Sequence, residues 1–398
     1  MKSRHLLAVA LGLACLTGLA ACSSGSKSSS ASAASPSAAS AGHSSTTAVA
    51  TGASGVAAAT AAVKAAQTVP STIPETQPLP HAPAPGTKVA FLTCSQTACS
   101  LLNPGFIAAA QALGWKPTVI TYNTATPGPA VQQAIDAGNK YIATTSIQLN
   151  EITPQLQEAK AKGIAIFGAY TPDVPQGAAN GLYGVAQDVA ASGVAGKLLP
   201  EWMISDSNGH ANAVYVTIPI FPSLNAGQTV AQQVFQQDCP ACTLGVLPLS
   251  LTQVGAGQTP SAVVSYLQAH PNVNYVYLSF QDLFPGVVSA LKTAGLDSKV
   301  KIVGQEAQQP ELQSMIDGTS SAWSILPEPY VMWVVVDWMA RLSVGMPLTS
   351  DIVAAGDNPE AFLVTNPQQA RSQLSDNSGN WPGPTNYEQQ FKALWKVG

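Results

Sequence analysis

The stretch KVAFLTCSQTACSLLNPGFIAAAQALGWKPTVITY, residues 88–122, decides the fold. It opens with an apolar run at residues 88–93 that has the pattern of a short buried strand, and it closes with a second strand pattern at residues 118–122. Between them, residues 106–113 have a helical pattern, and Gly114 follows as a natural helix stop. Strand, helix and strand in this order predict a βαβ unit of a parallel sheet.

The same alternation continues as far as residue 344. Further strands are predicted at residues 141–146, 164–170, 182–187, 213–218, 243–249, 275–280, 300–303 and 322–326. Further helices are predicted at residues 129–137, 151–162, 189–204, 224–237, 260–269, 285–294, 310–317 and 328–344. The fold class is therefore α/β, with two consecutive doubly wound parallel-sheet lobes. In such sheets ligands bind outside the carboxyl ends of the strands, so two facing lobes would form a ligand cleft.

The first residues have the pattern of an export signal. Lys2 and Arg4 precede an apolar run at residues 6–19, which is too short to span a membrane. Small residues then lead to Cys22, as in a bacterial lipobox. We expect residues 1–21 to be a lipoprotein signal peptide and Cys22 to carry the lipid; the alternative is an ordinary signal peptide with a chance cysteine.

Residues 22–86 consist mostly of Ser, Ala, Thr and Pro, with few large apolar side chains and almost no charge. A segment of this composition buries too little surface to offset its ordering entropy. We predict a disordered tether here, with a transient helix at residues 56–67 and an extended Pro-rich part at residues 70–85.

Charge and composition exclude several classes of function. The net charge is −4 and charged residues make up only 10% of the chain, so nothing indicates a nucleic-acid partner. Phosphate loops, zinc-protease motifs and nucleophile elbows are absent from the sequence. The histidines after the signal, namely His43, His81, His210 and His270, have no metal-ligand spacing. We expect a monomer that is not an enzyme and holds neither a metal nor a cofactor.

The cysteines beyond the signal and the lipobox form two local pairs, Cys94 with Cys99 and Cys239 with Cys242. An even number of cysteines in an exported chain predicts disulfides in both pairs. Two alternatives stay open. The spacing of Cys239 and Cys242 is also that of a thiol oxidoreductase motif, and Cys94 with Cys99 could contribute to a metal site.

Over residues 88–390 the chain resembles the type I periplasmic binding proteins, particularly the ribose- and galactose-binding group. The resemblance rests on the first strand and on the segments AAQALGW (109–115), GVAQD (184–188), SFQD (279–282), ALKTAG (290–295) and VGQE (303–306). It implies an extracytoplasmic solute-binding lipoprotein that serves an ABC-type importer. It also implies a hinge of three segments, near Asp188, Ile325 and residues 355–362. The N-terminal lobe would be residues 87–188 plus 326–355, and the C-terminal lobe residues 189–325 plus 356–398.

The resemblance also implies a set of ligand-binding residues. They follow successive strands or lie at the hinge: Ser95, Gln96, Tyr170, Asp188, Phe221, Asn225, Phe280, Gln281, Asp282 and Glu306. The Asp-Arg pair with which sugar binders clamp their ligand is missing, since Ala169 and Tyr170 occupy its place. Without an arginine, the site suits a neutral ligand or one with a positive charge near Glu306.

Some of these residues have a structural alternative. Tyr170, Phe221 and Phe280 could be core residues near strand ends, and Asp188 or Asp282 could cap the helix that follows it. Glu306 is the strongest ligand candidate, because a carboxylate in a cleft is costly without a partner.

We therefore expect a lipid-anchored protein outside the cytoplasm that captures a small polar solute for a membrane permease. A sugar or polyol is the expected ligand, with a small aromatic or amine solute as the alternative. A sensor that presents its closed form to a signalling receptor and, less favoured, an extracytoplasmic enzyme stay open. A sugar-responsive repressor is disfavoured, because a signal and a polar tether occupy the place of a DNA-binding domain.

Overall fold

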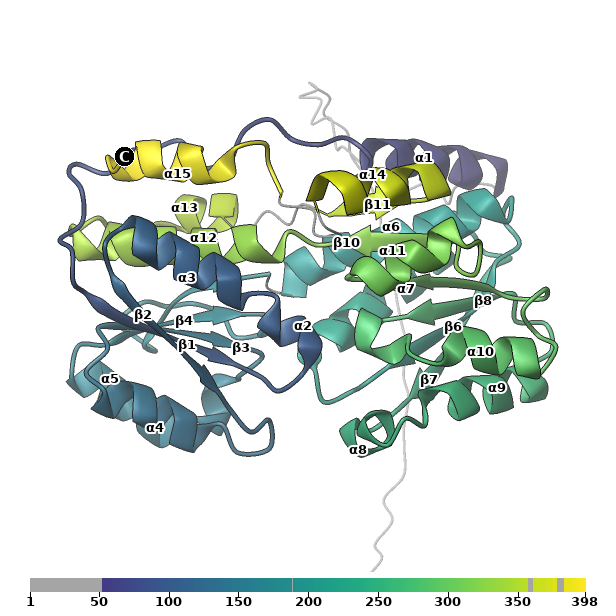
Figure 1. Cartoon of the computed structure of the whole chain (residues 1–398), viewed down its shortest axis with the longest axis horizontal. Helices are drawn as coiled ribbons and strands as arrows, with labels where there is room; N and C mark the ends of the chain where they lie inside the picture. Colours follow the sequence, from purple (N-terminus) through teal and green to yellow (C-terminus); the bar gives the residue numbers. More distant parts are fainter. Residues whose placement is uncertain (1–51, 188, 357–360, 378–382) are drawn as a thin grey trace, which may run out of the picture. The chain divides into compact units, whose positions relative to one another are not determined.

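The computed structural model describes residues 52–187, 189–356, 361–377 and 383–398 (Figure 1). Two separate sheets organise these residues. We call the first sheet with its helices the N-terminal lobe, and the second with its helices the C-terminal lobe. The predicted fold class, α/β with two parallel-sheet lobes, is confirmed.

The N-terminal lobe has a five-stranded parallel sheet in the order β2-β1-β3-β4-β5. Its strands are β1 (Lys88–Thr93), β2 (Lys116–Thr121), β3 (Tyr141–Thr145), β4 (Ala165–Ala169) and β5 (Leu182–Ala186). Side chains alternate between two cores, since Phe91 packs with α3 and α12 while Leu92 packs with α4 and α5 on the other face. The apolar run at residues 88–93 exists because both faces of β1 are buried.

The C-terminal lobe has a six-stranded sheet in the order β11-β10-β9-β8-β6-β7. Its strands are β6 (Asn212–Thr217), β7 (Thr243–Pro248), β8 (Tyr275–Leu278), β9 (Lys301–Gly304), β10 (Ala322–Ile325) and β11 (Phe362–Val364). All strand pairs are parallel except β10 with β11, which is antiparallel. The sequence did not predict strand β11. Val214 packs with α9 and α10, whereas Tyr215 packs with α6 and α7.

The helices largely follow the predicted ranges. Those of the N-terminal lobe are α2 (Thr97–Ser100), α3 (Asn103–Ala112), α4 (Gly128–Asp136), η1 (Leu149–Glu151), α5 (Thr153–Ala161), α12 (Glu328–Ser343), α13 (Ser350–Gly356) and α15 (Tyr387–Trp395). Those of the C-terminal lobe are α1 (Gly52–Ala65), α6 (Val189–Asp206), α7 (Pro222–Asp238), α8 (Leu251–Gly255), α9 (Thr259–Ala269), η2 (Gln281–Leu283), α10 (Val287–Thr293), α11 (Gln309–Ile316) and α14 (Pro367–Asn377). The sequence did not predict α14, α15 or the short helices α2, η1, α8, η2 and α13.

Both sheets share one strand order, apart from β11. In each lobe the first strand lies between the second and the third, as β2-β1-β3 and as β7-β6-β8. The connections leave in opposite directions on the two sides of the first strand, which opens a crevice at the carboxyl ends. The fold therefore predicts a ligand site beside the ends of β1, β3, β6 and β8.

The structure contradicts the predicted tether over residues 52–86. Helix α1 packs against α6 and α7, and its Ala59 is buried. Ile73 and Leu79 enter the core of the N-terminal lobe, and the Leu79 backbone nitrogen donates to Leu394 O at 2.8 Å. The composition of the whole segment concealed these few apolar residues, and tertiary packing supplies most of the stability of an Ala-rich helix. Residues 22–51 of the predicted tether lie outside the described residues.

The lobe boundaries also need a correction at the C-terminus. We expected residues 356–398 in the C-terminal lobe, but α15 packs on α12 of the N-terminal lobe. Its Trp395 stacks on Trp333 with ring centroids 5.2 Å apart, so burial of aromatic surface fixes the helix there. Consecutive elements therefore belong to different lobes at β5 and α6, β10 and α12, α13 and β11, and also at α1 and β1 and at α14 and α15 (Figure 1).

Candidate functional site

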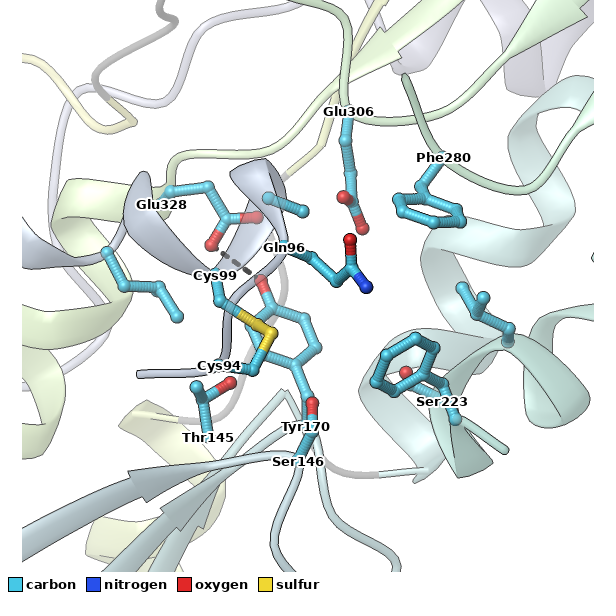
Figure 2. A pocket seen from close by; sticks show the side chains of 14 residues that line it. Cys94, Gln96, Cys99, Thr145, Ser146, Tyr170, Ser223, Phe280, Glu306 and Glu328 are labelled. Atoms are coloured by element: carbon cyan, nitrogen blue, oxygen red, sulfur yellow. Dashed lines mark hydrogen bonds between the residues drawn. A yellow bond between two sulfur atoms is a disulfide. The ribbon is translucent and has the colours of Figure 1, made fainter. Parts of the chain in front are cut away.

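A pocket lies at the carboxyl ends of the strands, where the strand order predicts it (Figure 2). About 450 Å³ of empty space, part of it open to solvent, is enclosed by loops of both lobes. The residues of its wall are Cys94, Gln96, Ala98, Cys99, Leu102, Thr145, Ser146, Tyr170, Phe221, Ser223, Leu224, Phe280, Glu306 and Glu328.

The loop after β1 forms one side of the wall. A disulfide joins Cys94 to Cys99 and closes this loop around the start of α2. A short covalent ring limits the conformations open to the loop. Gln96 extends from the ring into the pocket (Figure 2).

Two carboxylates enter the pocket from separate elements, Glu306 after β9 and Glu328 at the start of α12 (Figure 2). Glu328 is only 4% exposed, and Tyr170 Oη donates to its Oε2 at 2.8 Å. Burial raises the pKa of Glu328, and the bond from Tyr170 opposes the rise. Burial, together with the neighbouring carboxylates of Glu328 and Asp282, raises the pKa of Glu306 well above its ordinary value. Each acid therefore makes ionisation of the other more costly.

Asp282 connects the two lobes. Its Oδ2 accepts a hydrogen bond from the Thr97 backbone nitrogen at 3.0 Å, so a C-terminal-lobe carboxylate holds the first residue of α2 in the N-terminal lobe. Burial raises the pKa of Asp282, while bonds from the backbone of Thr97 and Ala98 oppose the rise. Asp282 thus contacts a helix of the other lobe.

Gln281 supports Glu306 from behind the wall. With its amide nitrogen turned toward Glu306, it donates to Glu306 Oε2 at 3.2 Å and to Glu306 O at 3.3 Å. The paired bonds fix both the carboxylate and the backbone of the residue. Gln281 is 4% exposed and is not among the residues of the wall, so it contacts Glu306 rather than the space of the pocket.

The backbone around the site adopts an unusual conformation. Ser146, Tyr170, Gln187 and Glu306 have φ angles of 55°, 56°, 52° and 63°. Non-glycine residues seldom adopt this left-handed conformation, and such strain costs about 1–3 kcal/mol for each residue. Ser146, Tyr170 and Gln187 directly follow β3, β4 and β5. Their clustering at strand ends around the pocket and an adjoining cavity supports a functional role.

Half of the predicted ligand residues come together here. Gln96, Tyr170, Phe221, Phe280 and Glu306 form part of the wall. Phe221 and Phe280 also belong to the core of the C-terminal lobe, so the core and ligand interpretations coexist.

The remaining predicted residues lie elsewhere. Gln281 and Asp282 stand behind the wall, in contact with Glu306 and Thr97. Ser95 and Asn225 are exposed and are not part of it, and Asn225 Nδ2 instead donates to Pro219 O at 2.9 Å. Asp188 lies outside the described residues.

Sequence reasoning missed four polar residues of the wall, Thr145, Ser146, Ser223 and Glu328. Thr145 and Ser146 end the predicted strand at residues 141–146, so the rule that ligands bind at carboxyl ends could have identified them. Glu328 adjoins the crossing at Ile325, but no local pattern showed that its side chain turns into the pocket.

The other cysteine pair lies away from the pocket. A disulfide joins Cys239 to Cys242 between α7 and β7, and neither residue belongs to the wall. Across the described ranges, no group of three or more His, Cys, Asp or Glu side chains is arranged to hold a metal ion. Helices in the same ranges are too short or too polar to cross a membrane.

Comparison with known proteins finds one matching family model. Residues 92–346 match the family model described as "Periplasmic binding protein domain". No curated protein matches the chain.

Solved structures resemble the chain over most of its length. One is a 5-methylthioribose transporter solute-binding protein from Thermotoga lettingae TMO, with a TM-score of 0.63 and 19% identity over 79% of this chain and 99% of that one. A sugar ABC transporter protein from Yersinia enterocolitica has a TM-score of 0.61 and 19% identity, over 79% of this chain and 98% of that one. A carbohydrate transporter protein from Acidothermus cellulolyticus 11B, bound to myo-inositol, has a TM-score of 0.58 and 16% identity, over 73% of this chain and 98% of that one. At these identities the likeness shows the fold alone.

Proposed function

This chain belongs to the periplasmic binding protein family, and from that premise we propose that it captures a sugar or polyol in the pocket and delivers it to the permease of an ABC-type importer. Family membership makes the chain a binding protein rather than an enzyme. It also implies a location outside the cytoplasm, in keeping with the signal pattern at residues 1–21.

The single observation that carries the proposal is the division of the pocket wall between the lobes. Gln96 and Tyr170 belong to the N-terminal lobe, and Phe280 and Glu306 to the C-terminal lobe. A solute that contacts both lobes favours their closure, because it gains contacts in the closed form that the open form lacks. The closed form is then available for recognition by a permease.

The chemistry of the wall supports a sugar or polyol. Gln96, Thr145, Ser146 and Ser223 offer hydrogen-bonding groups, and Phe280 offers an aromatic face on which a sugar ring can stack. We assign ligand contact to these residues and to Tyr170, Phe221 and Glu306. Gln281 and Asp282 position the wall.

Attachment through Cys22 is the second part of the proposal. A lipid at Cys22 would hold the protein at the outer face of the cytoplasmic membrane, since each buried methylene contributes about 0.8 kcal/mol. Replacing Cys22 with Ser is expected to move the protein from the membrane fraction to the soluble fraction of cells. A Cys22→Ser protein that stays with the membrane would contradict the lipid anchor.

Solute capture is tested by thermal unfolding of the full-length chain with a panel of sugars and polyols. A solute that binds the folded state raises the melting temperature. Gln96→Ala and Glu306→Ala are expected to abolish that rise. Ser95→Ala and Asn225→Ala are matched controls, because these residues flank the same loops but lie outside the wall.

Two results would contradict the proposal. One is full ligand stabilisation in both pocket variants, which would show that the solute binds elsewhere. The other concerns delivery: cells that lack this protein should lose uptake of the identified solute, and unchanged uptake would reject the importer role.

A further inference from the structure

The two carboxylates of the pocket have no basic partner among the residues that the structure describes. Neither Glu306 nor Glu328 belongs to any salt bridge found in the described ranges. The described residues of the pocket wall include no Lys, Arg or His. Among them, the two acids are therefore the only charged side chains.

Among the described residues, the surroundings of Glu306 also lack a neutralising group. The titratable groups that face it come from several elements, and all are acids or phenols: Asp282 of η2, Glu328 of α12, Tyr170 after β4 and Tyr215 of β6. Taking a carboxylate out of water without a cation costs several kcal/mol in real proteins. Two such groups at one pocket leave an unmet requirement for positive charge.

A second, independent feature indicates that a polar ligand completes the wall. Thr145 is 1% exposed, and its Oγ1 has no hydrogen-bond partner among the described residues. The side chain borders the pocket opposite Glu306 (Figure 2). An unpaired buried hydroxyl costs about 1–3 kcal/mol, and a ligand hydroxyl at this place would satisfy it.

The aromatic wall suits the same kind of ligand. Phe221, Phe280 and Tyr170 border the space that the carboxylates reach. Aromatic faces attract ammonium groups, by about 0.5–2 kcal/mol according to how far the cation is removed from water. A metal ion fits less well, because the described residues hold no group of three or more metal-ligating side chains.

We propose that the solute is a polyhydroxylated amine, such as an amino sugar or amino cyclitol, with its ammonium group at Glu306 and Glu328 and its hydroxyls toward Thr145 and Gln96. This inference rests on the proposed capture of a sugar or polyol and narrows its chemical class. The same wall would discriminate against the neutral hydroxyl counterpart, which leaves the two acids without a cation.

Proton linkage supports the assignment. Burial and the neighbouring acids raise the pKa of Glu306, and an ammonium group beside it would favour the ionised carboxylate and lower that pKa. Binding of an amine should therefore release protons and become tighter as the pH rises through the range in which Glu306 ionises. A neutral sugar would release none.

The test compares matched pairs of compounds on the full-length chain: glucose with glucosamine, galactose with galactosamine, and myo-inositol with an amino-inositol. N-acetylglucosamine retains the nitrogen without its charge. Calorimetric titration in two buffers of different ionisation enthalpy gives both the affinity and the number of protons released. We expect an amine to bind at least about tenfold more tightly than its hydroxyl partner, with net proton release.

Variants of Glu306 distinguish the effect of its charge from the effect of its shape. Glu306→Gln should remove the preference for the amine and abolish the proton release, because the amide keeps the size of the side chain but cannot ionise. Glu306→Asp should retain part of the preference. Asp317→Asn is the matched control, since it removes the same charge from an exposed position of the same lobe.

The outcomes distinguish the two proposals. Equal affinities for amines and hydroxyl partners would overturn this inference and leave sugar or polyol capture standing. A preference for amines that persists in Glu306→Gln would overturn it as well. Binding by no compound of either set would overturn both this inference and the proposed ligand class.

Discussion

Asp337 and Glu328 belong to the same helix, α12, and both are almost fully buried, with exposures of 2% and 4%. Asp337 has a cation beside it, because Arg341 Nε donates to its Oδ2 at 2.6 Å. Glu328 has a phenol instead, that of Tyr170, and Glu306 is a neighbouring acid. One helix thus carries a buried acid that the protein neutralises and another that it does not.

The neutralised acid serves the fold. Trp395 Nε1 donates to Asp337 Oδ1 at 2.7 Å, and Arg341 Nη2 donates to Gln77 O at 2.9 Å and lies 3.6 Å from Glu75 Oε1. The group therefore joins α12 to α15 and to the segment before β1. Its acid Asp337 pairs with Arg341, and neither residue belongs to the described pocket wall. Glu328 and Glu306 have unsatisfied charge at a pocket, which is the arrangement expected of a binding site.

The largest expected effect comes from breaking the neutralised group. Arg341→Met should lower the free energy of unfolding by about 3–5 kcal/mol, because it leaves Asp337 buried without a cation. Urea denaturation measures the loss. Arg341→Met with Asp337→Asn should recover part of it, since the double variant has no unpaired charge at this place. A loss below about 1 kcal/mol would show that burial does not make this pair important.

Removing an acid from the pocket should instead raise the free energy of unfolding. Glu306→Gln is expected to stabilise the ligand-free protein by about 1 kcal/mol near pH 8, because it removes a desolvated charge beside Glu328. Stability at the expense of function is common at binding sites.

The pH dependence provides the check. Glu306 has a pKa raised above its ordinary value of 4.5, so the folded state binds its proton more tightly than the unfolded chain. The free energy of unfolding therefore falls as the pH rises from 4.5 through the raised pKa, by at most about 1.4 kcal/mol per pH unit for one proton. Glu306→Gln should flatten this slope. Identical slopes in the two proteins would contradict unpaired burial.

Residues that follow strands were predictable because strands themselves are. The apolar runs and the glycine stops define the βαβ units, and the resemblance to the type I periplasmic binding proteins then assigned Gln96, Tyr170 and Phe280 to loops at the carboxyl ends, where all three line the pocket. The same reasoning failed for α1 and α15, because their stability comes from contacts with helices far away in the sequence. Local propensity does not report such docking.

Contacts between residues far apart in the sequence were unpredictable for the same reason. Tyr170 with Glu328 and Thr97 with Asp282 join residues separated by 158 and 185 positions. The first pair lies within the N-terminal lobe and the second joins the two lobes, and no periodic pattern encodes either placement. Sequence reasoning therefore identified Glu306 as a carboxylate that needs a ligand partner, but it did not include Glu328 in the site.

Asp282 is an intermediate case, since backbone N–H groups take the place of a cation. Asp282→Asn should weaken solute binding about fivefold, because a neutral acceptor makes a weaker bond to Thr97 across the lobes than a carboxylate does. Titration calorimetry gives the affinity. Asp297→Asn, an exposed position of the same lobe, serves as the control. An unchanged affinity in Asp282→Asn would mean that this contact does not stabilise the closed form.

The smallest effect is expected where an ion pair is short but exposed. Lys162 Nζ lies 2.5 Å from Glu158 Oε1, about as close as Arg341 Nε lies to Asp337, yet the two side chains are 48% and 35% exposed. Water screens the attraction, and fixing two long side chains costs entropy. Glu158→Gln should therefore leave the melting temperature unchanged within the error of a thermal unfolding experiment. A loss comparable to that of Arg341→Met would show that distance rather than burial decides the worth of an ion pair here, and the contrast between Asp337 and Glu328 would lose its physical basis.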